Sequence, residues 1–282
     1  ASGQNLTGKT GITGGGQSVI VTLNGKTYLA TVDNQGNWSA ALPAADLQSL
    51  PSGVQTIHVE ATDIAGNSIE STREVTVDTV SPILTLKPLT NDGIINAAES
   101  LNDQTISGNA LQSEAGRTVL VTVNNKNYQA QIQVDGSWST TIPAADLQAM
   151  ADGNYTVTAT LTGASGNSTT STESLTLDAN PANLPLLTVN AIALNNIIDG
   201  GEINVAQIIS GGSLNVEAGQ RVTVTLGDNT YTATVDGNGQ WRVSVPSVDL
   251  LHLAQGAHTV TIGVNDVSGN PATLSQTITV NT

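Results

Sequence analysis

Two loops of this sequence carry oxygen-bearing side chains at the same spacing. The loop at 92–99 is DGIINAAE and the loop at 195–202 is NNIIDGGE, so the first, fifth and eighth positions hold Asp, Asn or Glu in both. Calcium takes six to eight oxygen ligands, and such a site tolerates exchange between Asp and Asn. The alternative is a polar turn with an Asx cap and a helix-starting Glu, and the spacing is not that of an EF-hand. We predict Ca²⁺ ligands at Asp92, Asn96, Glu99, Asp199 and Glu202.

Other familiar motifs lack the context that their chemistry needs. Residues 3–10, GQNLTGKT, match the phosphate-loop pattern, but that loop needs a strand before it and a helix after it, and the sequence predicts neither. The three histidines have no i, i+4 histidine partner, the chain has no cysteine, and no G-x-S-x-G elbow occurs. We therefore expect no enzymatic activity and no catalytic or nucleotide-binding residues.

The charge of the chain disfavours several classes of partner. Asp and Glu number 23 against 8 Lys and Arg, which gives a formal net charge of −15. Nucleic acids and anionic membrane surfaces are bound mainly through Lys and Arg, so neither is an expected partner. Nor does the sequence contain an apolar run of about 18 residues, the length that a membrane-spanning helix needs. The composition suits a folded protein that binds cations.

The chain repeats itself about every 100 residues. Trp38, Trp138 and Trp241 are separated by 100 and 103 residues. Three other landmarks keep these steps: Pro43, Pro143 and Pro246; Tyr28, Tyr128 and Tyr231; Asp46, Asp146 and Asp249. We predict three domains at 1–79, 80–179 and 180–282, the first without its opening strand. They are called the first, second and third repeats below.

Within each repeat the apolar residues alternate with a period of two, as in half-buried strands. Val19, Val21 and Leu23 show this alternation, and the following Asn24-Gly25 predicts a hairpin turn because both residues tolerate positive φ. Each Trp begins an alternating strand after a Gly-containing turn, which indicates core packing rather than a sugar-stacking surface. Many short strands in a repeat of this length predict an all-β fold of tandem antiparallel immunoglobulin-like β-sandwiches.

Three stretches of the sequence resemble a known family. They are GRTVLVTVNNKNYQAQIQVDGSWSTTIPAADLQAMADGNYTVTAT in the second repeat, and TDIAGN and VTVDTVSP in the first. Together they are similar to the bacterial Ig-like repeats of giant type I-secreted adhesins. The resemblance covers nearly the whole chain and recurs three times. It implies an extended rod on a Gram-negative cell surface, with calcium within and between domains.

Sandwich topology predicts a second group of carboxylates at each junction between domains. The last strand ends at the pole that faces the next domain, and the B–C and F–G loops of that domain face back toward it. Asp178, Glu217 and Asp266 are therefore predicted to converge between the second and third repeats. Three unpaired carboxylates repel one another unless a cation lies between them. The alternative is that each carboxylate is solvated.

The first junction departs from this pattern. Asp78 and Glu114 are retained, but Gly163 stands where the third repeat has Asp266 and the first has Asp63. We include Asp63, Asp78 and Glu114 among the predicted metal ligands, and expect the first junction to bind calcium more weakly because ligand charge sets calcium affinity.

The function predicted is a structural one. Interchangeable modules suit a stalk that projects a distal binding region. The resemblance implies that such a stalk is secreted and lies on the bacterial cell surface, with roles in adhesion, biofilm formation and virulence. Its partners would be calcium ions and neighbouring repeats of the same chain, and we expect a monomer without a host or biofilm receptor on this segment. The alternative is an Ig-like module that itself binds host glycan or protein, which predicts extra loops or clustered aromatic residues in one repeat.

Overall fold

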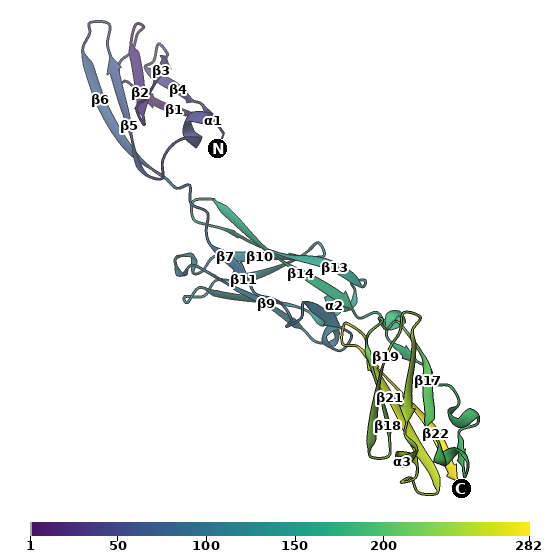
Figure 1. The fold of residues 1–282 in the computed structure, drawn as a ribbon. Coiled ribbons are helices and arrows are strands. Elements are labelled where there is room, and N and C mark those ends of the chain that lie inside the picture. The colour runs from purple at the N-terminus through teal and green to yellow at the C-terminus, as the bar shows by residue number, and fades with distance from the viewer. Residues whose placement is uncertain (1) are drawn as a thin grey trace. The chain divides into compact units, whose positions relative to one another are not determined.

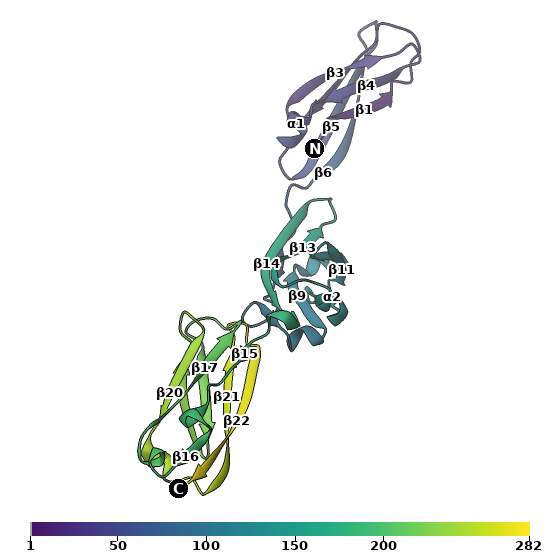
Figure 2. The same ribbon diagram turned by 90° about the vertical axis from the view of Figure 1, so that its right-hand side faces the viewer.

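The computed structural model describes residues 2–282 and divides into two compact units. The first unit comprises the residues through Pro82 together with the loop 162–168, and the second comprises 83–161 and 169–282. Both consist of short strands joined by tight turns, with α-helices of at most five residues (Figures 1 and 2). The all-β, antiparallel Ig-like class predicted from the alternation is confirmed. No helix within residues 2–282 combines the length and apolar character needed to cross a membrane.

The first repeat forms one curved six-stranded sheet in the order β1-β4-β3-β2-β5-β6. Asn24 and Gly25 both have positive φ and turn the chain from β2 into β3, as predicted. Residues 4–9 of the phosphate-loop match form strand β1, which is paired with β4. The next element along the chain is strand β2, not the helix that a phosphate loop needs. The elements are β1 (Gln4–Lys9), β2 (Ser18–Leu23), β3 (Lys26–Val32), β4 (Asn37–Leu42), α1 (Ala44–Gln48), β5 (Gly53–Thr62) and β6 (Ser68–Val77).

The second repeat has two sheets, in the orders β11-β10-β13-β14-β8 and β12-β9-β7. Its elements are β7 (Leu84–Leu86), β8 (Ile94–Asn96), η1 (Glu99–Leu101), β9 (Gln104–Ala110), η2 (Gln112–Glu114), β10 (Thr118–Val123), β11 (Lys126–Gln131), β12 (Ser137–Ile142), α2 (Ala144–Gln148), β13 (Gly153–Thr162) and β14 (Ser168–Asp178).

The third repeat has the same two sheets, in the orders β16-β22-β21-β18-β19 and β15-β17-β20. Its elements are η3 (Pro181–Asn183), β15 (Leu186–Leu187), η4 (Ile192–Leu194), β16 (Ile197–Asp199), η5 (Glu202–Asn204), β17 (Gln207–Leu214), β18 (Arg221–Leu226), β19 (Asn229–Thr234), β20 (Gln240–Val245), α3 (Ser247–Leu250), β21 (Gly256–Asn265) and β22 (Pro271–Asn281).

One pairing in each of the later repeats runs parallel, although the other strands are antiparallel. Strand β8 lies parallel to β14, and β16 lies parallel to β22. Both parallel strands are only three residues long. They belong to the segment that opens the repeat, and they lie beside the strand that closes it.

Each repeat has its own hydrophobic core, but the three cores differ in size. The cores of the second and third repeats contain 16 and 17 buried apolar residues, and that of the first contains 8. Trp138 and Trp241 are buried at 1% and 2% exposure, as the sequence predicted, whereas Trp38 is only half-buried. The first repeat therefore folds around the same residues with less of its apolar surface covered.

Candidate metal centre

The two predicted calcium loops have the same local geometry. The backbone N–H of Asn96 donates to Glu99 Oε2 (3.1 Å), and the N–H of Glu99 donates back to Asn96 Oδ1 (3.0 Å). In the third repeat Asp199 and Glu202 exchange the equivalent bonds, at 3.2 and 2.9 Å. This reciprocal arrangement is a capping box at the start of a short 3₁₀ turn. The side-chain oxygens thus accept hydrogen bonds from the backbone N–H groups of the turn. Each carboxylate still has free lone pairs that could bind a cation.

Asp92 belongs to a different turn in the same loop. It accepts hydrogen bonds from the backbone N–H of Ile94 and the hydroxyl of Thr90, both at 3.1 Å. These bonds, the one from Ile94 foremost, lower the pKa of the Asp92 carboxyl from its usual value. The structure therefore gives Asp92 a turn of its own, apart from the Asn96–Glu99 capping box.

Asn270 is the centre of the polar cluster in the second unit. Its side chain is 1% exposed and lies in the loop between β21 and β22. The amide nitrogen donates to the backbone carbonyl of Asp178 (3.1 Å) and to Asp266 Oδ2 (3.0 Å). The amide oxygen accepts from the N–H of Ala97 (2.8 Å), in the capping-box loop. One buried amide therefore joins the end of β14, the loop after β8 and the loop at 266–270.

The three carboxylate residues predicted to converge all contact this loop. Asp266 is 4% exposed and accepts the Asn270 backbone N–H at 2.8 Å. Glu217 Oε2 accepts the N–H of Val267 at 2.9 Å. Asp178 contributes its backbone carbonyl to Asn270. Their carboxylates are not gathered into one ligand set, since residues 2–282 contain no group of three or more Asp, Glu or His side chains placed to hold a metal.

In the part of the chain that the structure describes, no ion pair balances the acidic side chains of this cluster. Four ion pairs occur among residues 2–282: Lys26–Asp46, His58–Glu70, Arg117–Glu114 and Lys126–Asp146. None of them includes Asp178, Glu217 or Asp266. Asp266 is thus a buried carboxylate that is stabilised by amide groups and has no cationic partner within the described chain. A buried charge of this kind is costly unless it is paired or binds a metal.

The corresponding loop of the second repeat lies in the N-terminal unit and carries no carboxylate. Gly163 replaces the aspartate, but Asn167 keeps the bond to the preceding strand: its amide nitrogen donates to the carbonyl of Asp78 at 2.8 Å and to that of Val80 at 3.1 Å. The hydroxyl of Ser165 donates to Asp78 Oδ2 (2.5 Å), and this bond is the main reason that the pKa of Asp78 is lowered. Hydrogen bonds from neutral groups therefore satisfy Asp78.

Asp63 and Glu114 likewise have protein partners. Asp63 accepts the side-chain and backbone N–H groups of Asn67 (3.0 and 2.8 Å), and these lower its pKa. Glu114 pairs with the guanidinium of Arg117 at 2.9 Å. The third repeat has Gln220 at the position equivalent to Arg117, so Glu217 lacks that neighbouring cation.

The sequence analysis missed the asparagines of these loops. Asn67, Asn167 and Asn270 end the segments TDIAGN, TGASGN and NDVSGN, and the shared Gly-Asn was visible at the repeat spacing. The sequence could not show which backbone carbonyls Asn167 and Asn270 contact, because these partners lie 89 and 92 residues away along the chain.

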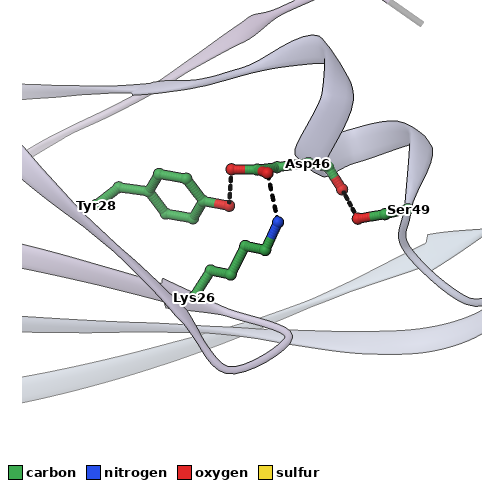
Figure 3. A network of polar contacts seen from close by, with 4 residues as sticks. All are labelled: Lys26, Tyr28, Asp46 and Ser49. Atoms are coloured by element: carbon green, nitrogen blue, oxygen red, sulfur yellow. Dashed lines mark hydrogen bonds and ion pairs between the residues drawn. The ribbon is translucent and has the colours of Figure 1, made fainter.

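A second polar network recurs in every repeat and holds the helical turn against a strand. In the first repeat the hydroxyl of Tyr28 donates to Asp46 Oδ2 (3.0 Å), and Lys26 pairs with Oδ1 of the same residue (2.5 Å; Figure 3). The other repeats keep the bond, from Tyr128 to Asp146 at 2.8 Å and from Tyr231 to Asp249 at 2.7 Å. Desolvation and the hydrogen bond raise the pKa of Tyr128 and of Tyr231 to about 12.

Comparison with known proteins places the repeats in a family. The bacterial Ig-like domain family matches residues 5–79, 84–179 and 197–282. No curated protein matches the chain.

Several solved structures resemble the chain. A 1.5-MDa bacterial ice-binding adhesin is 28% identical over 99% of this chain and 91% of its own, with a TM-score of 0.44. A Ca²⁺-stabilized ice-binding adhesin of an Antarctic bacterium is 31% identical over 100% and 69%, with a TM-score of 0.45. A tetra-tandem repeat from the extending region of a large adhesion protein is 26% identical over 98% and 70%, with a TM-score of 0.37. The three family matches cover most of the sequence, and the chain belongs to the bacterial Ig-like domain family.

Proposed function

We propose that this chain is a spacer segment of a secreted bacterial surface adhesin, and that calcium stabilises the junction between its second and third repeats. The domains would be 1–79, 80–179 and 180–282, each a structural module without catalytic activity. One of the adhesins named above is a 1.5-MDa bacterial protein, and another is described as Ca²⁺-stabilized. The proposal for this chain depends on its own residues at the cluster around Asn270.

The observation that carries the proposal is the position of Asp266. Its carboxylate is buried between two repeats, hydrogen-bonded to Asn270, and without a cationic side chain. Glu217 lies before β18 and accepts the N–H of Val267 in the loop of Asp266, and Asp178 ends β14. A calcium ion would take oxygens from these three residues and balance their charge. The Asn96–Glu99 pair lies next to them through Ala97 and would supply further oxygens.

The remaining predicted ligands are less suited to a strong site. Asp63 accepts the same two bonds from Asn67 that Asp266 accepts from Asn270, but it is only half-buried. Asp78 and Glu114 have a hydroxyl and a guanidinium partner, and Gly163 removes one charge. Asp199 and Glu202 repeat the capping-box geometry at the end of the third repeat.

Differential scanning calorimetry in EDTA and in calcium tests the proposal. A ligand that binds only the folded state stabilises by about 2.7 kcal/mol at a hundredfold excess over Kd. We expect calcium to raise the melting temperature and Glu217→Gln to reduce that increment, because the amide oxygen keeps the bond to Val267 while the charge is lost. Asp228→Asn, at an exposed hairpin turn, removes the same charge elsewhere and should leave the increment intact. Identical melting curves with and without calcium would refute the metal assignment.

A further inference from the structure

One carboxylate anchors the segment that joins the second repeat to the third. Asp152 stands directly before β13 and is half-buried. Its Oδ1 accepts the backbone N–H groups of Ala179 and Asn180, both at 2.9 Å, and its Oδ2 accepts the side-chain amide of Asn183 at 2.7 Å. Three donors of the linker, which we define as residues 179–184, therefore converge on a single side chain of the second repeat.

The other two repeats make part of this contact with neutral side chains. The backbone N–H of Thr79 donates to the hydroxyl of Ser52 at 3.2 Å, and that of Thr282 donates to Gln255 Oε1 at 3.0 Å. Ser52 and Gln255 stand directly before β5 and β21, as Asp152 stands before β13. The same position is thus used in all three repeats, and the second repeat places a charge there.

The linker itself is folded, and the third repeat holds it as well. Asn180 caps the short turn η3, since its Oδ1 accepts the N–H of Ala182 at 3.0 Å and its backbone carbonyl accepts the N–H of Asn183 at 2.9 Å. From the third repeat, the side-chain nitrogen of Asn215 donates to the backbone carbonyls of Ala182 (3.4 Å) and Leu184 (3.1 Å). Hydrogen bonds therefore run without a break from the second repeat through the linker to the third.

Apolar packing is too loose to hold the linker by itself. A cavity of about 510 Å³ lies between the linker and the second repeat. Its walls include Pro181 and Leu184 of the linker and Leu101, Leu147 and Met150 of the second repeat. Apolar groups that face each other across such a space lose most of the van der Waals contact that would fix a chain segment. The polar bonds therefore determine where the linker lies.

The carboxylate of Asp152 is satisfied without a metal ion. Burial acts to raise the pKa of this carboxyl, but the bonds from Ala179, Asn183 and Asn180 outweigh burial and hold the pKa below its usual value. Each donor turns the positive end of an N–H bond toward the carboxylate and so favours its charged form. Hydrogen bonds to an ionised acceptor are also stronger than those between neutral groups.

We propose that Asp152 and Asn215 form a metal-independent clasp that fixes the orientation of the third repeat on the second. Asp152 holds the linker to the second repeat, and Asn215 ties the same linker to the third. The inference rests on the proposed spacer role, because a spacer needs junctions that keep their angle. It does not rest on the calcium assignment, since the Asn270 cluster makes none of these bonds.

The test measures the distance between the two repeats in EDTA, where calcium has no influence. The chain has no cysteine, so Gln129→Cys on β11 and Thr232→Cys on β19 place one spin label in each repeat. Double electron–electron resonance of the full chain should give a narrow distance distribution in EDTA. Asp152→Ala should broaden it, and amide exchange at Ala179 and Asn180 should become about tenfold faster or more, because bonds to a charged acceptor are lost.

Three further variants make the comparison specific. Asp152→Asn keeps an oxygen for the two backbone N–H groups but loses the acceptor for Asn183, so it should broaden the distribution less than Asp152→Ala. Asn215→Gly breaks the other half of the clasp, accommodates the φ of 57° at this position, and should broaden the distribution. Asp103→Ala removes the same charge and a 2.9 Å bond to the N–H of Ala144, which lies outside the linker, and should change nothing. Melting curves check that each variant is folded.

Three results would overturn the proposal. One is a parent chain whose distribution in EDTA is already as broad as that of Asp152→Ala and narrows only in calcium, since the metal would then fix the orientation. Another is an equal width for the parent and the two Asp152 variants. The third is equal broadening by Asp103→Ala. Calorimetry with and without calcium is a separate measurement, so the absence of a calcium effect there would refute the metal assignment and leave the clasp standing.

Discussion

The side-chain nitrogen of Asn270 lies 3.1 Å from the backbone oxygen of Asp178, and this bond joins the third repeat to the strand that closes the second. The same amide also contacts Ala97 and Asp266. A single buried side chain thus satisfies groups on three segments that are far apart in sequence.

Replacing this asparagine should be costly. Asn270→Ala removes the side-chain partner of the Ala97 N–H, of the Asp178 carbonyl and of Asp266 Oδ2, while the backbone N–H of residue 270 still bonds Asp266 Oδ1. Each buried group left unsatisfied costs roughly 1–3 kcal/mol, so we expect a loss of a few kcal/mol in urea unfolding followed by Trp241 fluorescence. Asn67→Ala removes the equivalent, exposed amide of the first repeat and should cost less. Equal losses would show that the contacts of Asn270 across the junction contribute nothing.

The raised tyrosine pKa values predict a loss of stability at high pH. The folded pKa of Tyr128 and Tyr231 is about 12, above the value of about 10 for a free phenol. Between these values the unfolded chain has released protons that the folded chain retains, so the contribution is fully present below about pH 10 and is lost as pH rises toward 12. Thermal melts from pH 9 to 12 should show this decline. In the Tyr231→Phe variant the melting temperature of the third repeat should fall less over this pH range. An equal fall in the variant would contradict the raised pKa of Tyr231 as its cause.

Lys126, which belongs to the same network, should stabilise the fold at neutral pH but not at acidic pH. The hydrogen bond from Lys126 is the main cause that lowers the pKa of Asp146, so its stabilising effect is present above the unfolded pKa and is lost as pH falls through the folded one. Lys126→Asn, which copies Asn229 of the third repeat, should therefore lower the melting temperature at pH 7 but not at pH 2. Lys87→Asn changes the same charge at a lysine outside the four ion pairs and controls for net charge.

Gly211 should not tolerate a side chain. A Cβ there would lie 1.9 Å from the Thr188 oxygen and 2.7 Å from the Trp241 ring. Gly211→Ala must displace the opening strand, and overpacking of this kind costs typically about 1–3 kcal/mol. Gly237→Ala, at a position with open space and no positive φ, is the matched control and should be nearly neutral. The comparison can be made by urea unfolding of the two variants.

The repeat spacing and the alternation were enough to predict the fold class, because both are local patterns repeated three times. The hairpin at Asn24-Gly25 follows from backbone preferences of two residues. The parallel pairing of β8 with β14 did not follow, since it joins three-residue segments about 80 positions apart. For the same reason the sequence treated the Asn96–Glu99 loop and the Asp266 loop as separate sites, although Ala97 and Asn270 connect them. The ion pair of Glu114 with Arg117, three residues away, was within reach of local reasoning.

The parallel contact of β8 with β14 also determines how a repeat responds to tension. When the chain is pulled from both ends, the load enters the second repeat at β7, which is paired with β9, then passes to β8 and leaves the repeat after β14. Because these two strands run parallel and are directly paired, their hydrogen bonds are loaded together in shear and must break together rather than one after another. The third repeat has the same contact between β16 and β22. We therefore expect the second and third repeats to resist tension through the same short parallel contact.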